Sequence, residues 1–231
     1  MKKKDIFYII VILFFVSLYV YTEYQDYKNR VIYTLSDIKD YSGEDVIILN
    51  DNVPEFDSIS DINTSFEIYG DFDSLGRCTY AYANIGKDLM PTTERESIYE
   101  IKPTGWHSVT YDIIPEDHHL YNRCHLIAHK LTAENANPKN LITCNRYMNT
   151  DVMQEYEIKV GNYIRRTNNH VLYRVTPIFD NDNLVAKGVQ IEALSLEDNG
   201  KGIKFNIFAY NIEPMVEIDY STGENHLVSN N

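Results

Sequence analysis

The residues best suited to chemistry fall in one window of the chain, between positions 121 and 157. In chain order they are Arg123, His125, Asn140, Asn149 and Glu157. Hydrolysis of a phosphodiester needs an activated water, a counter-charge for the phosphate oxygens and help for the departing oxyanion. An imidazole, an arginine and a divalent metal held by amide or carboxylate oxygens can meet these three needs. The residue types therefore indicate phosphoryl chemistry.

A helix must position two of these groups. Over Asp151–Arg166 the apolar residues recur at helical spacing, which predicts the best-defined helix of the chain. Asn149 and Glu157 are separated by two steps of four residues, so an amide oxygen and a carboxylate are expected on one side of this helix. Asn149 or Thr150 is also well placed to cap the helix. The metal-ligand and capping interpretations of Asn149 therefore stand side by side.

In these residues the chain resembles the DNA/RNA non-specific endonucleases, which have a ββα-metal (His-Me finger) core, and in particular their DNA-entry branch. That family carries an Asp-Arg-Gly-His motif on a strand, then an Asn before an apolar run, a metal-binding Asn and a Glu. The matching residues are Arg123 and His125, then Asn140, Asn149 and Glu157, with steps of nine and eight residues between the last three. Other matching segments extend the resemblance over most of residues 75–224: 105–107, 173–177, 205–207 and 218–223.

The resemblance implies a role for each catalytic residue. His125 would be the general base that takes a proton from water, and Asn149 would hold one Mg²⁺, with Mn²⁺ as the alternative ion. Glu157 would orient water near the metal, and Arg123 would position the phosphate. Products with 5′-phosphate ends are also implied.

Three further residues are expected to contact the substrate. These are Asn140, His119 in the loop before the motif, and Arg95, which stands where the DNA-entry branch places an arginine. Two motif positions depart from the family, because Asn122 replaces its Asp and Cys124 replaces its Gly. The departures, together with the acidic net charge, motivate a rival interpretation, in which a surface protein of this fold binds nucleic acid without cutting it.

The N-terminal residues predict a membrane anchor. Lysines at positions 2–4 precede an apolar run at 6–21, whose helical length of about 24 Å can span a bilayer once. No small-x-small cleavage site follows, which favours an uncleaved anchor over a signal peptide. The lysines place the rest of the chain outside a bacterial cytoplasmic membrane, where DNA uptake machinery is a candidate partner and nutrient scavenging a candidate purpose. If the segment is cleaved, the protein is secreted, and a toxin nuclease is the second rival.

Beyond the anchor, the pattern predicts one α+β domain with an antiparallel sheet around the ββα-metal core. The expected divisions are an anchor at 1–22, a stalk at 23–40, a nuclease domain at 41–224 and a tail at 225–231. Strand-like runs precede the helix at 45–50, 78–84 and 107–113, and follow it at 171–179, 184–194 and 203–211. The last three are joined by turns rich in Asp, Asn and Gly, which predicts an antiparallel meander.

The charge of the chain sets a limit on its partners. The net charge is −13, and because residues 1–22 carry three lysines and one aspartate, the remainder has −15. Taken alone, this argues against nucleic acid. Residues 121–180 reverse the sign locally, with eight Lys/Arg against five Asp/Glu, so a basic strip can still meet phosphates.

The cysteines allow two interpretations. Three cysteines are too few for a disulfide scaffold, but Cys124 and Cys144 flank the expected site, which motivates the hypothesis of a single bridge outside the cell. A zinc site made of His118, Cys124, His129 and Cys144 is the alternative. It is disfavoured because these residues lack the paired spacing typical of zinc ligands.

Overall fold

A computed structural model describes residues 4, 8, 11–12, 14–17, 38–57, 59 and 61–228 of the 231-residue chain. The chain forms two compact units, Met1–Thr34 and Leu35–Asn231. The described residues of the first unit are helical. Within the described ranges, no helix has both the length and the apolar character needed to cross a membrane. Most of the predicted anchor and stalk lies outside the described residues, so both stay predictions.

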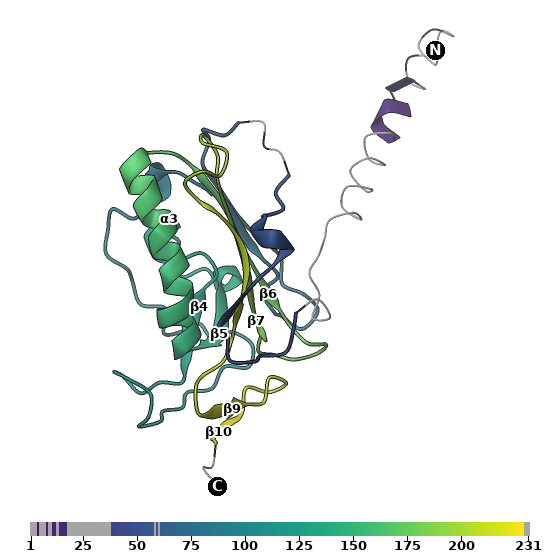
Figure 1. Cartoon of the computed structure of the whole chain (residues 1–231). Coiled ribbons are helices and arrows are strands. Elements are labelled where there is room, and N and C mark those ends of the chain that lie inside the picture. The colour runs from purple at the N-terminus through teal and green to yellow at the C-terminus, as the bar shows by residue number, and fades with distance from the viewer. Residues whose placement is uncertain are drawn as a thin grey trace. The chain divides into compact units, whose positions relative to one another are not determined.

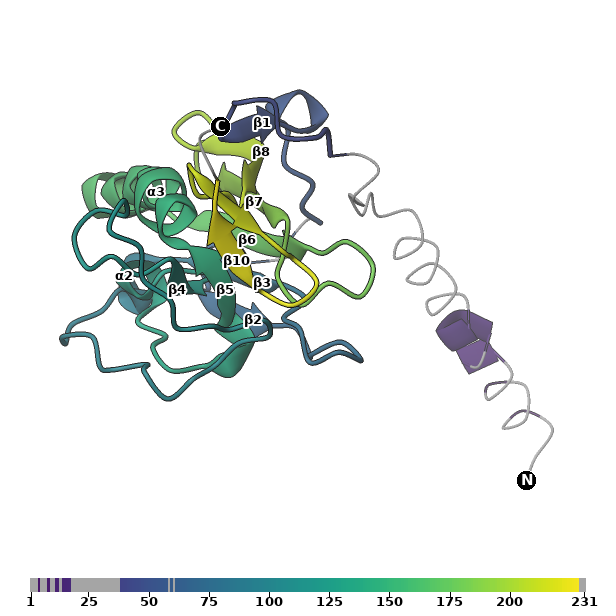
Figure 2. The same ribbon diagram turned by 90° about the horizontal axis from the view of Figure 1, so that it is seen from below.

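The second unit is built on a six-stranded sheet in the order β1-β8-β7-β6-β3-β2, with every neighbouring pair antiparallel. The strands are β1 (Val46–Ile48), β2 (Phe66–Tyr69), β3 (Ala81–Ile85), β6 (Val171–Ile178), β7 (Gly188–Ser195) and β8 (Lys204–Tyr210). The strands β6, β7 and β8 are consecutive in the chain and adjacent in the sheet (Figures 1 and 2). The predicted meander and the predicted α+β class with an antiparallel sheet are confirmed.

Two antiparallel hairpins complete the strands. One pairs β4 (Tyr121–His125) with β5 (Leu141–Asn145), and the other pairs β9 (Val216–Ile218) with β10 (Asn225–Leu227). The first hairpin leads into the long helix, which begins at Arg146 and continues through the π turn η5 (Met148–Met153) into α3 (Gln154–Thr167). The shorter helices are η2 (Asn50–Asn52), η3 (Lys87–Leu89), α2 (His129–Thr132) and η4 (Pro138–Asn140). Two strands and a helix thus follow one another around the motif.

The main core lies between one face of the sheet and the β4–β5 hairpin with its helix (Figures 1 and 2). Alternate residues of the central strands point into it, as Val189, Ile191 and Ala193 of β7 show. They belong to the same cluster as Val160 and Ile164 of α3, which are also fully buried. The elements that carry the chemical residues are therefore held in place by the largest apolar contact of the fold.

The opposite face of the sheet is polar but covered. Glu192 of β7 is 1% exposed, and its carboxylate accepts hydrogen bonds from the Glu55 N–H at 2.8 Å and from Arg174 Nε at 2.7 Å. Asn206 of β8 donates to the backbone carbonyl of Val53 at 3.0 Å. These bonds fasten the segment after η2 across this face of the sheet. They also pair the buried carboxylate of Glu192, so its charge is not isolated.

Three segments differ from the sequence predictions. Residues 107–113 form no strand but only a bridge from Thr110 to His119, because their apolar side chains pack in a small cluster with β4 and β9. Residues 225–227, predicted as part of the tail, form β10. The edge strand β2 was not predicted, since four residues are too few to establish an alternating pattern.

The long helix starts earlier than predicted. Its first helical residue is Arg146, and the side chain of Asn145 accepts a hydrogen bond from the Met148 N–H at 2.8 Å. This is the geometry of an N-cap. The capping role predicted for Asn149 or Thr150 is therefore wrong, because both residues lie inside the first turns.

Candidate active site

A cavity of about 410 Å³ brings together three separate parts of the chain. Five of the seven residues singled out from the sequence line it: Arg95, Arg123, His125, Asn149 and Glu157. They come from the loop after η3, from β4 and from the long helix. The convergence that the spacing predicted is thus present in the fold.

The ring of His125 is desolvated and held in one orientation. It is 7% exposed at the end of β4, and its Nε2 lies 2.7 Å from the backbone carbonyl oxygen of Asn135. A carbonyl oxygen can only accept, so Nε2 carries the proton and Nδ1 of the neutral ring is left as the proton acceptor. Burial lowers the pKa of His125 to about 4; the hydrogen bond to Asn135 opposes this shift, and the charges of Arg95 and of protonated His129 add to it. At neutral pH the ring is therefore uncharged and basic at Nδ1.

Asn149 lies inside the π turn that opens the helix. In a regular α-helix, residues eight apart are offset by about 80° around the axis, since 3.6 residues make one turn. A π turn closes its hydrogen bonds over five residues instead of four, so it advances less per residue and removes part of this offset. Asn149 and Glu157 accordingly line the same cavity.

Glu157 is a buried carboxylate with a cationic partner. Its Oε2 lies 2.9 Å from Nζ of Lys130 on α2. Burial raises the pKa of Glu157, while Lys130 and, more weakly, Arg95 lower it. The ion pair offsets part of the cost of burying the charge and joins α2 to α3 at the cavity wall.

Arg95 reaches the cavity from a long loop, and Asn135 holds that loop in place. The side-chain amide of Asn135 donates to the backbone carbonyl of Glu96 at 3.2 Å, while the backbone carbonyl of Asn135 accepts from His125. Burial lowers the pKa of the Arg95 guanidinium from a value so high that the group stays cationic. One residue therefore positions both the imidazole and the segment that carries the arginine.

Arg123 also lines the cavity, but much of its guanidinium group is engaged in contacts with other residues of the protein. Nη2 donates to the backbone carbonyl of Tyr99 at 2.7 Å, and Nε donates to that of Ile101. Cζ lies 3.9 Å from the ring centroid of Trp106 and 5.2 Å from that of Tyr99. The structure thus gives Arg123 a role in holding the segment around residue 100, and its contact with phosphate stays a prediction.

Asn140 does not reach the cavity. It is fully buried, its Oδ1 accepts from the Ile127 N–H and its Nδ2 donates to the Ile127 carbonyl, both at 2.9 Å. The substrate contact predicted for Asn140 is wrong, because both ends of its amide are used to tie the segment after His125 to the start of β5. His119 is exposed on its bridge to Thr110 and is absent from the cavity lining, so the structure does not bring it to the other residues.

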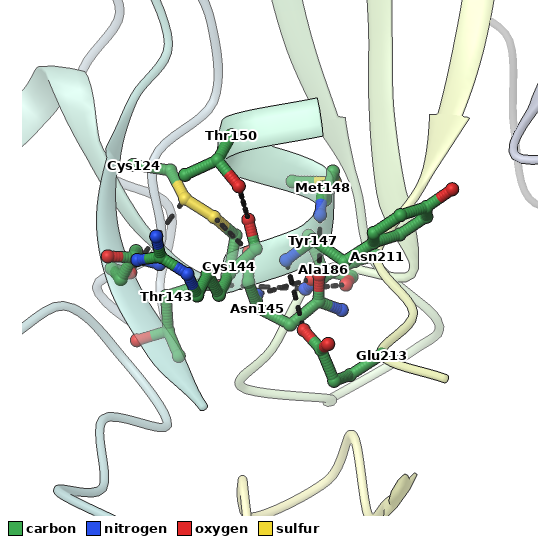
Figure 3. Close-up of a disulfide and its surroundings, with 12 residues drawn as sticks. Cys124, Thr143, Cys144, Asn145, Tyr147, Met148, Thr150, Ala186, Asn211 and Glu213 are labelled. Atoms are coloured by element: carbon green, nitrogen blue, oxygen red, sulfur yellow. Dashed lines mark hydrogen bonds between the residues drawn. A yellow bond between two sulfur atoms is a disulfide. The ribbon is translucent and has the colours of Figure 1, made fainter. Parts of the chain in front are cut away.

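Cys124 and Cys144 form a disulfide across the β4–β5 hairpin, with their Cα atoms 5.9 Å apart (Figure 3). The bridge hypothesised from the sequence is confirmed, and the alternative zinc site is wrong because both thiols are consumed. Among the described residues, no three His, Cys, Asp or Glu side chains are grouped as metal ligands. Cys124 is fully buried and does not line the cavity. The residue that replaces the family glycine therefore lies beneath the site, not in it.

Polar side chains fasten the start of the helix beside this disulfide (Figure 3). Asn211 accepts a hydrogen bond from the Asn145 N–H at 2.9 Å, and Glu213 accepts one from the Tyr147 N–H at 2.9 Å. Asn211 also donates to the Ala186 carbonyl at 2.9 Å. The first turn, which includes Asn149, is thereby fixed relative to the hairpin that carries His125.

Several cavity residues were not predicted from the sequence. His129, considered from the sequence only as a ligand of the disfavoured zinc site, begins α2 and lines the cavity beside Lys130 and Gln154. The positions of His129 and Lys130, four and five residues after His125, could have drawn attention to them. Asn135 gave no such signal, since it contacts His125 through a backbone carbonyl that every residue possesses.

Comparison with known protein families gives a match over residues 58–196 to the model described as DNA/RNA non-specific endonuclease. The matched region is more than half of the chain and contains β4, β5 and the long helix. The chain belongs to this family of nucleases. The resemblance to the family is thereby confirmed, and nucleic acid is the substrate class of the family. A comparison with curated proteins returned no match.

Solved structures of nucleases have the same fold. NucA from Streptococcus agalactiae with magnesium ion bound is 25% identical over 79% of this chain and 87% of that chain, with a TM-score of 0.70. The same protein with no metal bound is 23% identical, covers 88% and 97% of the two chains, and has a TM-score of 0.72. Sda1 nuclease with bound zinc ion is 26% identical over 71% and 81%, with a TM-score of 0.60.

The disulfide predicts a definite count of thiols. Protein unfolded without reductant should show one free thiol, that of Cys78, and three after reduction. Replacing both bridged cysteines by serine should lower the free energy of unfolding by about 3 kcal/mol, the value for a loop of this size, with Cys78→Ser as the matched control. More than one titratable thiol before reduction would contradict the bridge.

Proposed function

We propose that the protein is a divalent-metal-dependent endonuclease that cuts DNA, and also RNA, with His125 as general base. The observation that carries the proposal is the shared cavity, lined both by an imidazole whose free nitrogen is basic and by the oxygen donors of Asn149 and Glu157. A water that loses its proton to Nδ1 becomes the nucleophile that attacks phosphorus. In-line attack with departure of the 3′ oxygen leaves 5′-phosphate ends.

The donor set suits a hard, hydrated cation. Asn149 offers a carboxamide oxygen and Glu157 a carboxylate, and Mg²⁺ prefers such oxygens and keeps several of its waters. The lack of a three-residue cage among the described residues is consistent with an ion held by one or two protein oxygens and by the substrate. When bound, Mg²⁺, or Mn²⁺ in its place, would supply positive charge to stabilise the departing oxygen. Asn149 is the proposed direct ligand, and Glu157 the group that orients water beside it.

Cationic side chains in the cavity support binding to the phosphate backbone. Arg95 lines the cavity with much of its surface open to solvent, and it forms no salt bridge with a carboxylate in the part of the chain that the structure describes. Lys130 is engaged by Glu157, and Arg123 is engaged by backbone carbonyls. Contacts to phosphate carry no sequence information. Arg95 is therefore proposed as the main phosphate ligand, and cutting with little sequence preference follows.

Two substitutions test the roles of the base and the metal ligand. Plasmid nicking in the presence of Mg²⁺ should fall by about 10²- to 10⁴-fold in His125→Ala, because the proton acceptor is lost. Asn149→Ala should fall by at least about 10-fold and require more Mg²⁺ for half-maximal activity. His226→Ala, at an exposed histidine in β10, is the matched control and should stay within about twofold.

Nicking by His125→Ala at the wild-type rate would remove the proposed mechanism. Absence of nicking by the wild-type chain with any divalent ion would favour the rival, a surface protein that binds nucleic acid without cutting it. The buried position of Cys124 weakens the case for that rival, since the substitution of the family glycine does not alter the cavity lining.

The pH profile tests the state of His125 separately. Because burial lowers the pKa of His125 to about 4, the base is deprotonated and active down to about pH 5, where an ordinary histidine would be protonated. The acidic limb of kcat/KM, measured at saturating Mg²⁺, should therefore lie near pH 4. In Arg95→Gln the limb should move to higher pH, since a positive charge that disfavours the imidazolium is removed. A limb near pH 6.5 in the wild type would contradict the assignment.

We propose further that the nuclease unit works outside a bacterial cytoplasmic membrane, tethered by the N-terminal segment. The disulfide supports this location, because such bonds persist in oxidising compartments. Protease added to intact cells should then degrade the nuclease unit and leave an N-terminal fragment in the membrane. A mature N-terminus beyond residue 22 would show release instead of tethering, and full protection from the protease would place the unit inside.

A further inference from the structure

An aromatic side chain stands almost free in solvent beside the cavity. Tyr99 is 71% exposed, the highest value among the large hydrophobic residues that the structure describes. Its chain neighbour Ile98 and its cation–π partner Arg123 both line the cavity. The ring of Tyr99 therefore lies at the rim of the candidate active site, where burial in a core does not explain it.

The ring is held in place although it is exposed. Arg123 packs against Tyr99 at 5.2 Å and against Trp106 at 3.9 Å, measured from Cζ to the ring centroids. The same guanidinium donates to the backbone carbonyls of Tyr99 and Ile101. We name Tyr99, Arg123 and Trp106 the aromatic clamp. A side chain held in this way loses little further freedom when a ligand binds, so binding to it costs less entropy.

The backbone beneath the clamp is also fixed. Gly105, next to Trp106, has a φ of 66°, and a Cβ at this position would lie 2.4 Å from Cγ2 of Val185. Only glycine suits both the left-handed backbone and the close approach. Trp106 is partly buried against the small cluster of β4 and β9. The clamp is thus rigid on its inner side, and Tyr99 is its exposed end.

We propose that Tyr99 is a stacking platform for an unpaired base, and that the preferred substrate is single-stranded nucleic acid. This inference rests on the proposed function, which places the phosphate that is cut in the neighbouring cavity. Every base has a π face, so a bare aromatic ring binds single strands without reading their sequence. In a duplex both faces of each base are already stacked, so the ring of Tyr99 would add little binding free energy.

The test measures binding and not only cleavage. In a His125→Ala background with Mg²⁺, the affinity for a mixed-sequence single-stranded oligodeoxynucleotide should fall by roughly 5- to 150-fold in Tyr99→Ala, the range for loss of one stacking platform. Tyr99→Phe and Tyr99→Trp should keep the affinity within about twofold, because the ring and not the hydroxyl is used. The backbone carbonyl that Arg123 binds is retained in all three variants. Tyr80→Ala, at a less exposed tyrosine outside the cavity lining, is the matched control.

Two further nucleic-acid ligands, an abasic single strand and a duplex, test whether Tyr99 binds the free base. Tyr99→Ala should change affinity by less than about twofold for an abasic strand of the same length and for the duplex, since neither offers a free π face. An equal loss on the single strand and the abasic strand would overturn the proposal, as would a loss in Tyr99→Phe as large as in Tyr99→Ala. No loss of affinity in Tyr99→Ala would overturn it as well.

Nicking by the chain with His125 intact separates the two proposals. If that chain cuts and Tyr99→Ala binds single strands as well as the parent, only the stacking proposal fails. If it does not cut with Mg²⁺ or Mn²⁺, yet binding depends on Tyr99 as described, the proposed function fails and the platform stands.

Discussion

The hydrogen bond from Nε2 of His125 to the backbone carbonyl of Asn135 is the interaction on which the site depends. Burial alone would make the imidazole neutral but would leave open which nitrogen carries the proton. An acceptor that cannot donate removes that choice, because only one tautomer satisfies it. The side chain of Asn135 then fastens the loop of Arg95, so the imidazole and the guanidinium share one support.

These contacts are maintained because the elements that carry them cannot move independently of one another. The β4–β5 hairpin and the helix are packed onto the sheet through the main apolar core. The disulfide crosses the hairpin one residue before His125, and the bonds from Asn211 and Glu213 fix the first turn of the helix. The proposed general base and the proposed metal ligand, which lie on different elements, thus keep a constant relation, which is the condition for positioned catalysis.

Whether a residue of the site could be predicted from the sequence depended on whether its contacts are made by its side chain or by its backbone. The roles expected of His125, Asn149 and Glu157 belong to their side chains, which stand at characteristic steps in the sequence, and all three line one cavity. Asn140 was found for the same reason, but its role was wrong because full burial cannot be inferred from residue type. Asn135 could not be found, since its contact to the ring is made by the backbone.

The fold, in turn, could be predicted only where the periodic pattern of the sequence is strong and tertiary packing does not override it. The meander β6–β8 and the long helix have strong periodic patterns, and both were predicted. The segment 107–113 alternates like a strand, but its apolar residues are used in a local cluster, a choice made by tertiary packing. The π turn left no trace in the pattern, because one additional residue in a turn is smaller than the uncertainty of any helix boundary.

That π turn makes the helix behave as if a single residue had been inserted near its beginning. Deleting one residue there would let the turn relax into ordinary α-helical geometry, with good hydrogen bonds and no loss of apolar packing farther along α3. Asn149 and Glu157 would then be seven residues apart on a regular helix, an offset of about 20°, so both would still face the cavity. Relaxation to α-helical geometry without the deletion would instead restore the offset of about 80° and turn Asn149 away from the wall it shares with Glu157. The additional residue is therefore compatible with the site only while the turn stays wide, although an ordinary α turn would satisfy the backbone.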